Sequence, residues 1–456
     1  MVSRKKQPEL TAEEKLLQAL VPEAEQPYKI PDNWCWTRLE FVARGFQYGY
    51  TEKASLEKIG PKYIRISDIN NGNVDYINAP YCKIIDEDFL KYELRRGDIL
   101  IARMGSVGIN GMFLDDIKAV FASYLIRIIP MINNKYLSNF LQTDFYWNQI
   151  EDSAQGTTRL NVNANILKKL KIPCPPLVEQ QRIVERIEIL FGKLDEAKEK
   201  LQNTLDTFET RKAAILHKAF TGELTANWRK QHGLTMDSWE EKTLNDIASY
   251  KKGPFGSSIT KAMFVPKTAN TYKVYEQGNV IRKDLTYGHY YITSEKYQEL
   301  KGFSVKAGDI LISCAGTIGE VYKLPPECEE GVINQALMRV RLNQNIIEGY
   351  FCYYFGEIIK DDVIDKSNGT AMKNIPPFKV LKAIQIKLPT INEQTEIVRI
   401  VDNLLAKEQQ AHNIAQNALA KIDLIKKSIL ARAFRGQLAT NNPADEPAVE
   451  LLKRVL

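Results

Sequence analysis

The strongest constraint on this chain is a long stretch that occurs twice. The first copy covers residues 175–225 and the second covers residues 388–439. The pair Glu-Gln at 179–180 returns at 393–394, and Ala-Phe-x-Gly at 219–222 returns at 433–436. The offset is 214 residues at both signatures, so the stretch between them has the same length in the two copies. Internal repetition on this scale predicts two versions of one structural unit.

Each copy has the pattern of a long amphipathic helix, because apolar residues recur at alternating spacings of three and four. Prolines stand just before the helical pattern of each copy, and Gly222 and Gly436 follow its last apolar residues, as helix boundaries require. Two helices with matched seams are predicted to pack on each other. Arg211 and Glu408 interrupt the seam, so they either fix the register or face a partner subunit. The predicted seam consists of Ile187, Leu190, Leu194, Leu201, Phe208, Ile215, Val401, Leu404, Ile422, Ile425 and Ile429.

A divergent domain precedes each helix. The segment GDILIARMGSVG at 97–108 corresponds closely to GDILISCAGTIG at 308–319, and YIRISDIN at 63–70 corresponds loosely to YKVYEQGN at 272–279. Strand-like runs separated by Gly, Asn and Asp, with helical spacing near the end, predict a mixed α+β domain in each half. The shared segments imply a shared scaffold, and the divergence between them implies two different recognition targets.

Composition places the chain of 456 residues among ordinary soluble globular proteins, with 44% hydrophobic and 26% charged residues. No apolar run approaches the roughly 18 residues of a membrane span, and the polar N-terminus is no signal peptide, so a cytoplasmic protein is expected. Six cysteines without a CxxC pair and only four histidines indicate reduced thiols and no zinc or other metal site. The net charge of +6 suits a polyanionic partner.

The sequence contains no catalytic motif. It has no GxxxxGK[ST] phosphate loop, and the GSVG and GTIG segments are interpreted as tight turns after a buried strand. The chain is therefore predicted not to be an enzyme by itself.

The turn-like segments of both divergent domains are rich in side chains that hydrogen-bond phosphates and base edges. Their recurrence at matched positions in the two halves predicts DNA binding. Arg103 suits a bidentate contact with guanine, and Gln277 suits one with adenine. The predicted DNA-binding residues are Arg65, Arg103, Ser106, Thr157, Thr158, Arg159, Lys252, Ser257, Ser258, Gln277, Thr317, Thr370 and Lys373.

These repeated elements together resemble the specificity subunit of a type I DNA restriction–modification system, over nearly the whole chain. The resemblance implies that each variable domain is a target-recognition domain for one half of a bipartite double-stranded DNA sequence. It also implies that the helices act as a spacer and as a docking surface for two methyltransferase subunits and two restriction/translocase subunits. S-adenosylmethionine, ATP and magnesium are then expected in these partners, and no cofactor is expected in this chain.

The expected fold is α+β, with two α/β target-recognition domains joined by two long conserved helices, packed as an antiparallel coiled coil with pseudo-twofold symmetry. Residues 1–30 form either a docked helix, which Thr11 and Glu14 would begin with a capping box, or a tail. The expected boundaries are an N-terminal helical segment at 1–30, recognition domain 1 at 31–175, spacer helix 1 at 176–222, recognition domain 2 at 223–388, spacer helix 2 at 389–438 and a C-terminal tail at 439–456.

Two other classes of protein compete with this interpretation. A coiled-coil scaffold would organise proteins without reading DNA, and it would lack the steep salt dependence that phosphate contacts give to duplex binding. A self-sufficient nuclease or methyltransferase would need motifs that the sequence lacks, and binding of S-adenosylmethionine to this chain alone would reveal it.

The spacer interpretation predicts a target with a non-specific gap of several base pairs, whose length follows the length of the helices. Inserting four residues at matched positions of both helices adds about 6 Å, close to two base-pair rises of about 3.4 Å. We expect methylation mapping to show a preferred gap that is longer by one or two base pairs. An unchanged gap would contradict the spacer role.

Overall fold

The computed structural model describes residues 11–154, 161–359 and 377–456. They form two compact units, of which the first combines the chain up to Gln202 with Asn417–Leu456, and the second is Asn203–Gln416. The boundary falls within both repeated helices. Each unit therefore contains part of each helical copy.

The first unit contains a mixed sheet of six strands in the order β2-β9-β6-β7-β5-β4, with the pairs β3-β8 and β1-β10 beside it. Its strands are β1 (Cys35–Arg38), β2 (Ala43–Tyr48), β3 (Lys62–Ile64), β4 (Ile69–Asn70), β5 (Gly72–Val74), β6 (Ile99–Ala102), β7 (Asn110–Met112), β8 (Ala119–Phe121), β9 (Leu125–Pro130) and β10 (Lys171–Cys174). Its α-helices are α1 (Ala12–Ala19), α2 (Asp86–Tyr92), α3 (Asn134–Phe140), α4 (Asp144–Ala154), α5 (Ala164–Lys168), most of α6 (Leu177–Asp206), the end of α15 (Ile391–Ala433) and α16 (Ala448–Val455).

The second unit repeats this plan with the sheets β12-β19-β16-β17 and β14-β13-β18-β15 and the pair β11-β20. Its strands are β11 (Glu240–Thr243), β12 (Ala248–Lys252), β13 (Thr271–Tyr275), β14 (Tyr291–Thr293), β15 (Ser304–Val305), β16 (Ile310–Ser313), β17 (Val321–Lys323), β18 (Gly331–Ile333), β19 (Leu337–Leu342) and β20 (Gln385–Leu388). Its own α-helices are α7 (Phe208–Phe220), α8 (Ala226–Gln231), α9 (Leu244–Ile247), α10 (Gln277–Arg282), α11 (Ser294–Glu299), α12 (Glu348–Tyr353) and α14 (Phe378–Lys382). The shared scaffold is confirmed, because β2-β9-β6-β7 corresponds to β12-β19-β16-β17.

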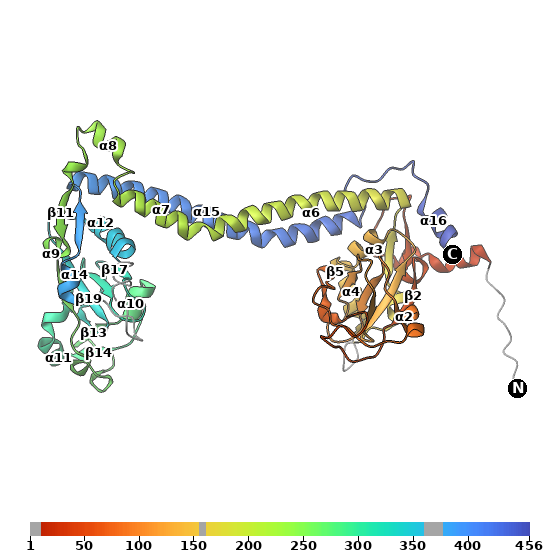
Figure 1. Cartoon of the computed structure of the whole chain (residues 1–456), viewed down its shortest axis with the longest axis horizontal. Coiled ribbons are helices and arrows are strands. Elements are labelled where there is room, and N and C mark those ends of the chain that lie inside the picture. Colours follow the sequence, from red (N-terminus) through yellow and green to blue (C-terminus); the bar gives the residue numbers. More distant parts are fainter. Residues whose placement is uncertain (1–10, 155–160, 360–376) are drawn as a thin grey trace. The chain divides into compact units, whose positions relative to one another are not determined.

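The repeated helices pack antiparallel within each unit (Figure 1). In the first unit Lys426 of α15 pairs with Asp195 of α6, with 2.6 Å between Nζ and Oδ1. In the second unit Arg211 Nε of α7 lies 2.7 Å from Glu408 Oε2 of α15. The two polar residues that interrupt the seam thus pair with each other, which favours the register-fixing role over contact with a partner subunit.

The first helical copy differs from the expected single helix, because Thr207 separates α6 from α7. The Thr207 hydroxyl donates to the Asn203 carbonyl at 2.7 Å, and Arg211 Nη2 donates to the Thr204 carbonyl at 3.1 Å. Side chains that compete for helix carbonyls bend or interrupt a helix. The second copy has no such pair and forms the continuous 43-residue helix α15.

Most of the predicted seam residues turn away from solvent. Ile425 is an exception at 44% exposure. Between Ile422 and Ile429, the residue of α15 that contacts α6 is Lys426 and not Ile425. The Lys426 ammonium lies 5.1 Å from the Phe191 ring centroid. Ile187, Val401 and Ile422 are buried, and Leu190, Leu194, Leu201, Phe208, Ile215, Leu404 and Ile429 are half-buried.

A buried carboxylate attaches the start of α6 to the first unit. Glu179 is fully buried, and its Oε2 accepts from Trp34 Nε1 at 2.7 Å and from Asn441 Nδ2 at 2.9 Å. Thr440 Oγ1 donates to Oε1 at 3.3 Å. Burying a carboxylate is costly unless donors surround it, and the first turn of a helix also favours negative charge.

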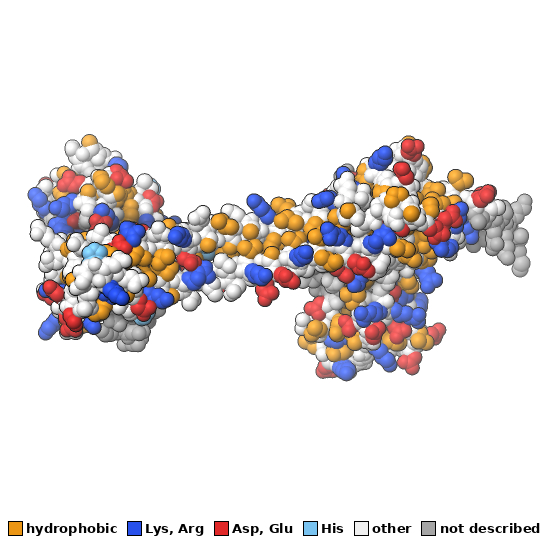
Figure 2. All heavy atoms as spheres, turned by 90° about the horizontal axis from the view of Figure 1, so that it is seen from above, with side chains coloured by type: hydrophobic (Ala, Val, Ile, Leu, Met, Phe, Trp, Pro, Cys, Tyr) orange, Lys and Arg blue, Asp and Glu red, His pale blue; other side chains and the backbone are white. Residues whose placement is uncertain are grey.

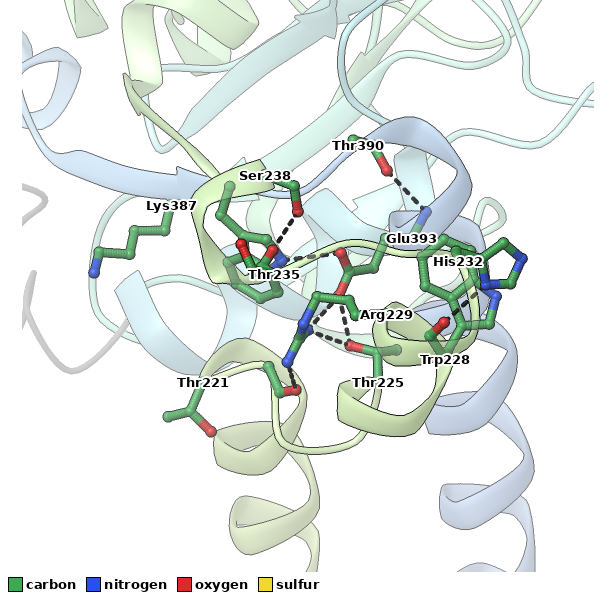
Figure 3. Close-up of polar contacts among 12 residues, drawn as sticks. Thr221, Thr225, Trp228, Arg229, His232, Thr235, Ser238, Lys387, Thr390 and Glu393 are labelled. Atoms are coloured by element: carbon green, nitrogen blue, oxygen red, sulfur yellow. Dashed lines mark hydrogen bonds and ion pairs between the residues drawn. The ribbon is translucent and has the colours of Figure 1, made fainter.

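Glu393 occupies the equivalent place at the start of α15 in the second unit (Figure 3). It accepts from Trp239 Nε1 at 3.0 Å and from Thr225 Oγ1 at 2.7 Å, and it forms an ion pair with the buried Arg229. Arg229 also donates to the Gly222 carbonyl at 2.5 Å. This cluster of contacts thus joins the end of α7 and the start of α15 to Trp239, which directly precedes β11.

The glutamines that follow these glutamates complete the attachment. Gln180 Nε2 donates to the Pro175 carbonyl at 2.9 Å, and its Oε1 accepts from Asn133 N at 3.0 Å. Gln394 does the same with Pro389 and Ile347, at 2.8 and 2.9 Å. Both Glu-Gln pairs are therefore structural.

Aromatic contacts attach the helix ends. In the first unit Phe434, at the end of α15, lies 5.0 Å from Tyr136 and 5.4 Å from Phe140 between ring centroids. In the second unit Phe220, at the end of α7, lies 5.3 Å from Tyr350 and 4.9 Å from Tyr354. The rings of the second unit and those of the first are related by the same offset of 214 residues. The first unit therefore holds the end of the second helical copy, and the second unit holds the end of the first copy.

The capping box at α1 is confirmed, with Thr11 N donating to Glu14 Oε2 at 2.8 Å and Glu14 N to Thr11 Oγ1 at 3.2 Å. In the first unit α1 packs against α16, and Lys15 Nζ donates to the Leu456 carbonyl at 3.4 Å. All six cysteines are free thiols. Among the described helices none has the length and apolarity to cross a bilayer.

Removing the charge of each buried glutamate should have unequal effects. Glu393→Gln leaves Arg229 buried without its counter-ion, and we expect a loss of about 3–5 kcal/mol in the unfolding free energy. Glu179 forms no ion pair among the described residues, so Glu179→Gln only weakens its hydrogen bonds. We expect the unfolding free energy to fall by about 1–3 kcal/mol. Urea denaturation, with hydrogen exchange of peptides from each unit, measures both. Equal losses would contradict the importance of the ion pair.

Candidate nucleic-acid interface

In the first unit, the ends of four strands converge at one edge of the fold. The chain leaves β2, β3, β6 and β8 there, and backbone hydrogen bonds join the exits. Tyr50 N donates to Phe121 O at 2.8 Å, Ala122 N to Ile64 O at 2.9 Å, and Arg103 N to the Tyr124 carbonyl at 2.9 Å. The side chains on these exits are therefore held in one group by the main chain.

The second unit builds the same frame at the ends of β12, β13, β16 and β18. Asn334 N donates to the Tyr275 carbonyl at 3.0 Å, as Ala122 does to Ile64, and Cys314 N donates to the Ala336 carbonyl at 2.8 Å, as Arg103 does to Tyr124. The backbone geometry is repeated while the side chains differ. Cys314 is buried where the first unit has the half-buried Arg103, and burial raises the pKa of its thiol to about 12.

A glycine in each frame allows two exits to approach closely. A Cβ on Gly49 would lie 2.3 Å from the carbonyl oxygens of Phe121 and Ala122. A Cβ on Gly253 would lie 1.8 Å from the Asn334 carbonyl oxygen. Only glycine permits this approach, so both positions are needed for the shape of the edge.

Strand pairing corrects one alignment made from the sequence. Lys62 pairs with Ala119 in the first unit, and Lys273 pairs with Gly331 in the second. The two strands therefore correspond with Lys62 matched to Lys273, two residues away from the match of YIRISDIN with YKVYEQGN. The sequence could not resolve this offset, because neither segment contains a shared apolar pattern long enough to fix it.

The corrected register places Arg65 and Glu276 at the same point of the frame. Arg65 forms a bidentate contact with Asp68, at 3.1 Å for Nε and 3.0 Å for Nη2, and this hydrogen bonding raises the pKa of its guanidinium. Burial raises the pKa of the Glu276 carboxyl. Residues of opposite charge thus follow matched strands, β3 and β13.

The structure brings the described candidates of the first unit to this edge. Arg65 follows β3, and Arg103 and Ser106 follow β6. The Arg103 guanidinium carbon lies 4.7 Å from the Tyr48 ring centroid, and its buried Nε has no hydrogen-bond partner among the described residues. Ser106 is exposed. Thr157, Thr158 and Arg159 lie outside the described residues.

The second unit brings its candidates to the matching edge. The exposed Lys252 ends β12, Gln277 begins α10, and the exposed Thr317 lies in the turn after β16. Gln277 Nε2 donates to the Thr317 carbonyl at 3.1 Å and to the Ala315 carbonyl. Ser257 is exposed and Ser258 half-buried in the loop after β12. Thr370 and Lys373 lie outside the described residues.

Sequence reasoning missed Glu276, Asn334 and Arg282, which line a pocket of about 520 Å³ with Gln277 and Thr317. Glu276 and Asn334 were hidden because they directly follow buried strands, where polar residues resemble ordinary strand ends. Their signal was the repeated turn position after β13 and β18, which only the correct register reveals.

The glycine-rich turns are confirmed as turns. Gly105 and Gly108 follow the fully buried β6, and Gly316 and Gly319 follow β16, all with positive φ. Among the described residues no group of three or more His, Cys, Asp or Glu side chains could hold a metal ion.

The sequence matches the family described as type I restriction modification DNA specificity domain at residues 49–207 and 236–419. The chain belongs to this family. It is 25% identical over 445 residues to the Type I restriction enzyme EcoBI specificity subunit of Escherichia coli, covering 92% of this chain and 89% of the relative. It is 24% identical over 445 residues to the EcoKI specificity subunit of Escherichia coli strain K12, with 92% of each chain covered.

The fold is also similar to that of a solved family member. The HsdS subunit from Thermoanaerobacter tengcongensis superimposes with a TM-score of 0.66 and 19% sequence identity. The match covers 91% of this chain and 100% of the other. Two recognition domains of mixed helix and sheet are therefore the architecture of this chain.

The glycine constraint predicts unequal effects of two alanine substitutions in one loop. Gly253→Ala forces the Asn334 backbone to move, and we expect a loss of about 1–3 kcal/mol in the unfolding free energy, as for other overpacked sites. Gly256→Ala is the matched control, because a Cβ there meets nothing within 4 Å. Urea denaturation of the two variants compares them. Equal midpoints would show that the strand exits tolerate separation.

Proposed function

We propose that this chain is the DNA-reading, non-catalytic specificity subunit of a type I restriction–modification complex. Each unit reads one half of a bipartite double-stranded target, and a non-specific gap separates the halves. The observation that carries this proposal is the repeated backbone frame at the strand exits, which presents different side chains in the two units. One frame with two sets of side chains suits two half-sites of different sequence.

The side chains at the edge divide into two chemical groups. Exposed lysine and hydroxyl groups, such as Lys252, Ser257 and Thr317, suit phosphate contacts that position a duplex. Arg103, held against Tyr48, is restrained enough to select a base edge. Specificity then depends on few side chains, and affinity on many.

The paired helices supply a surface for partner subunits. Apolar side chains follow the helices in a band (Figure 2). Ile189 of α6 and Leu424 of α15 are 53% and 64% exposed in the first unit. Contiguous exposed apolar residues are typical of protein–protein interfaces. We propose that two methyltransferase subunits and two restriction/translocase subunits dock on the chain and supply S-adenosylmethionine, ATP and magnesium chemistry.

Methylation mapping tests this function directly. The chain is co-expressed with its methyltransferase subunits in a host lacking adenine methylation at the same sites. We expect methylation at one bipartite motif with a fixed gap. A scaffold without sequence readout would give no motif, and duplex binding by the purified complex would then lack a steep dependence on salt.

Arg103 should contribute to base selection in the first half-site. We expect Arg103→Ala to relax one base position, with about 1–3 kcal/mol of discrimination against other bases lost. Arg103→Lys keeps the charge but not the planar fork, so it should retain affinity and lose selectivity. Arg96, exposed and paired with Asp116, is a matched control whose change to alanine should leave the motif intact. Selection from randomised duplexes by the assembled complex measures all three, and a uniform loss across sequences would mark Arg103 as a phosphate contact.

A further inference from the structure

The pocket at the strand-exit edge of the second unit has an unusual polarity for a surface that binds a polyanion. Glu276 is half-buried there, directly after β13, and it is the N-cap residue of α10, with its N–H donating to Asn279 Oδ1 at 2.8 Å. Among the described residues its carboxylate forms no ion pair. A carboxylate offers about four lone-pair sites, more than the contact with the first turn of α10 uses. Glu276 lines the pocket, so its carboxylate keeps acceptor capacity at this edge of the second unit.

The neighbouring cations have other partners or other positions. Lys273 Nζ donates to the Leu285 carbonyl at 2.6 Å and lies 3.9 Å from Glu329. The Arg282 guanidinium carbon lies 5.0 Å from the Tyr287 ring centroid. Among the described residues no cation therefore contacts the Glu276 carboxylate directly, and Lys273 acts on it only at longer range. This arrangement weakens binding to phosphate and needs another explanation.

Gln277 strengthens the same polarity. Its amide nitrogen donates to the main-chain carbonyls of Ala315 and Thr317, which turns the amide and leaves its oxygen as an acceptor. Two neighbouring side chains of the pocket thus present acceptors. Bases that offer a hydrogen-bond donor in the major groove are cytosine, through its N4 amino group, and adenine, through its N6 amino group.

We propose that Glu276 reads the amino group of a cytosine or adenine in the half-site bound by the second unit. This inference rests on the proposed DNA-reading function. The carboxylate accepts a hydrogen bond from the amino group, and it repels guanine and thymine, whose major-groove edges carry O6 and O4 acceptors at the same place. Glu276 thus selects bases more than it adds affinity, because its charge opposes the phosphates of every sequence equally.

The charge reversal between matched positions follows from this role. Arg65 of the first unit occupies the point that Glu276 occupies in the second. A guanidinium donates and a carboxylate accepts, so the frame carries side chains of opposite hydrogen-bonding character at matched positions, although Arg65 already donates to Asp68.

Glu276→Gln separates reading from capping. The amide keeps an oxygen that can cap α10, but it adds a donor and removes the charge that rejects O4 and O6. In the assembled complex we expect one position of one half-site to relax from cytosine or adenine alone to include thymine or guanine, with discrimination falling by about tenfold or more. The other half-site should be unchanged. Which of the two amino bases is read follows from the wild-type motif and from duplexes carrying each of the four bases at that position.

Glu327→Gln is the matched control, because it removes an exposed carboxylate elsewhere in the same unit and should leave the motif unchanged. Methylation mapping and binding to the duplex panel measure all variants. An unchanged motif with normal methylation in Glu276→Gln overturns the inference, and so does a uniform loss at all sites, which marks a structural cap. Absence of any motif in the wild-type complex overturns the proposed function instead.

Discussion

The fold depends on two buried carboxylates, Glu179 and Glu393, at the start of the repeated helices. Each is fully buried and accepts from a tryptophan that opens the domain, Trp34 or Trp239. A buried charge tolerates little displacement, since every lost donor leaves it poorly solvated. The start of the helix and the tryptophan before the first strand are therefore held together in each unit. The glutamine that follows each glutamate also binds the loop before α3 in the first unit and before α12 in the second.

The equal length of the two helical copies follows from where each begins and ends. α15 is attached by Glu393 in the second unit and by Phe434 in the first, whereas the first copy is attached by Glu179 in the first unit and by Phe220 in the second. Within each unit, antiparallel pairing fixes the register of one copy against the other. An insertion in one copy alone would break the pairing in one unit, which explains the constant offset of 214 residues.

The sequence predicted what depends on periodicity and repetition, and missed what depends on local hydrogen bonds. The helices, the paired domains and the turns after β6 and β16 follow from apolar spacing and glycine positions. The interruption at Thr207 does not, because it arises from a hydroxyl and a guanidinium that reach helix carbonyls. The match of Lys62 with Lys273 required strand pairing, and Glu276 therefore stayed unrecognised. Five of the predicted DNA-binding residues lie outside the described residues and stay predictions.

A fixed frame with variable side chains separates two demands on a DNA-reading protein. The main-chain bonds from Ala122 to Ile64 and from Asn334 to Tyr275 hold the strand exits without using any side chain. Side chains on the exits can therefore change from Arg to Glu, or from Arg to Cys, without altering the backbone that presents them. A carboxylate in such a place lowers affinity for all duplexes, so its benefit lies in the sequences that it rejects. New half-site specificities then require changes in a few side chains of one unit, while the helices and their attachments stay the same.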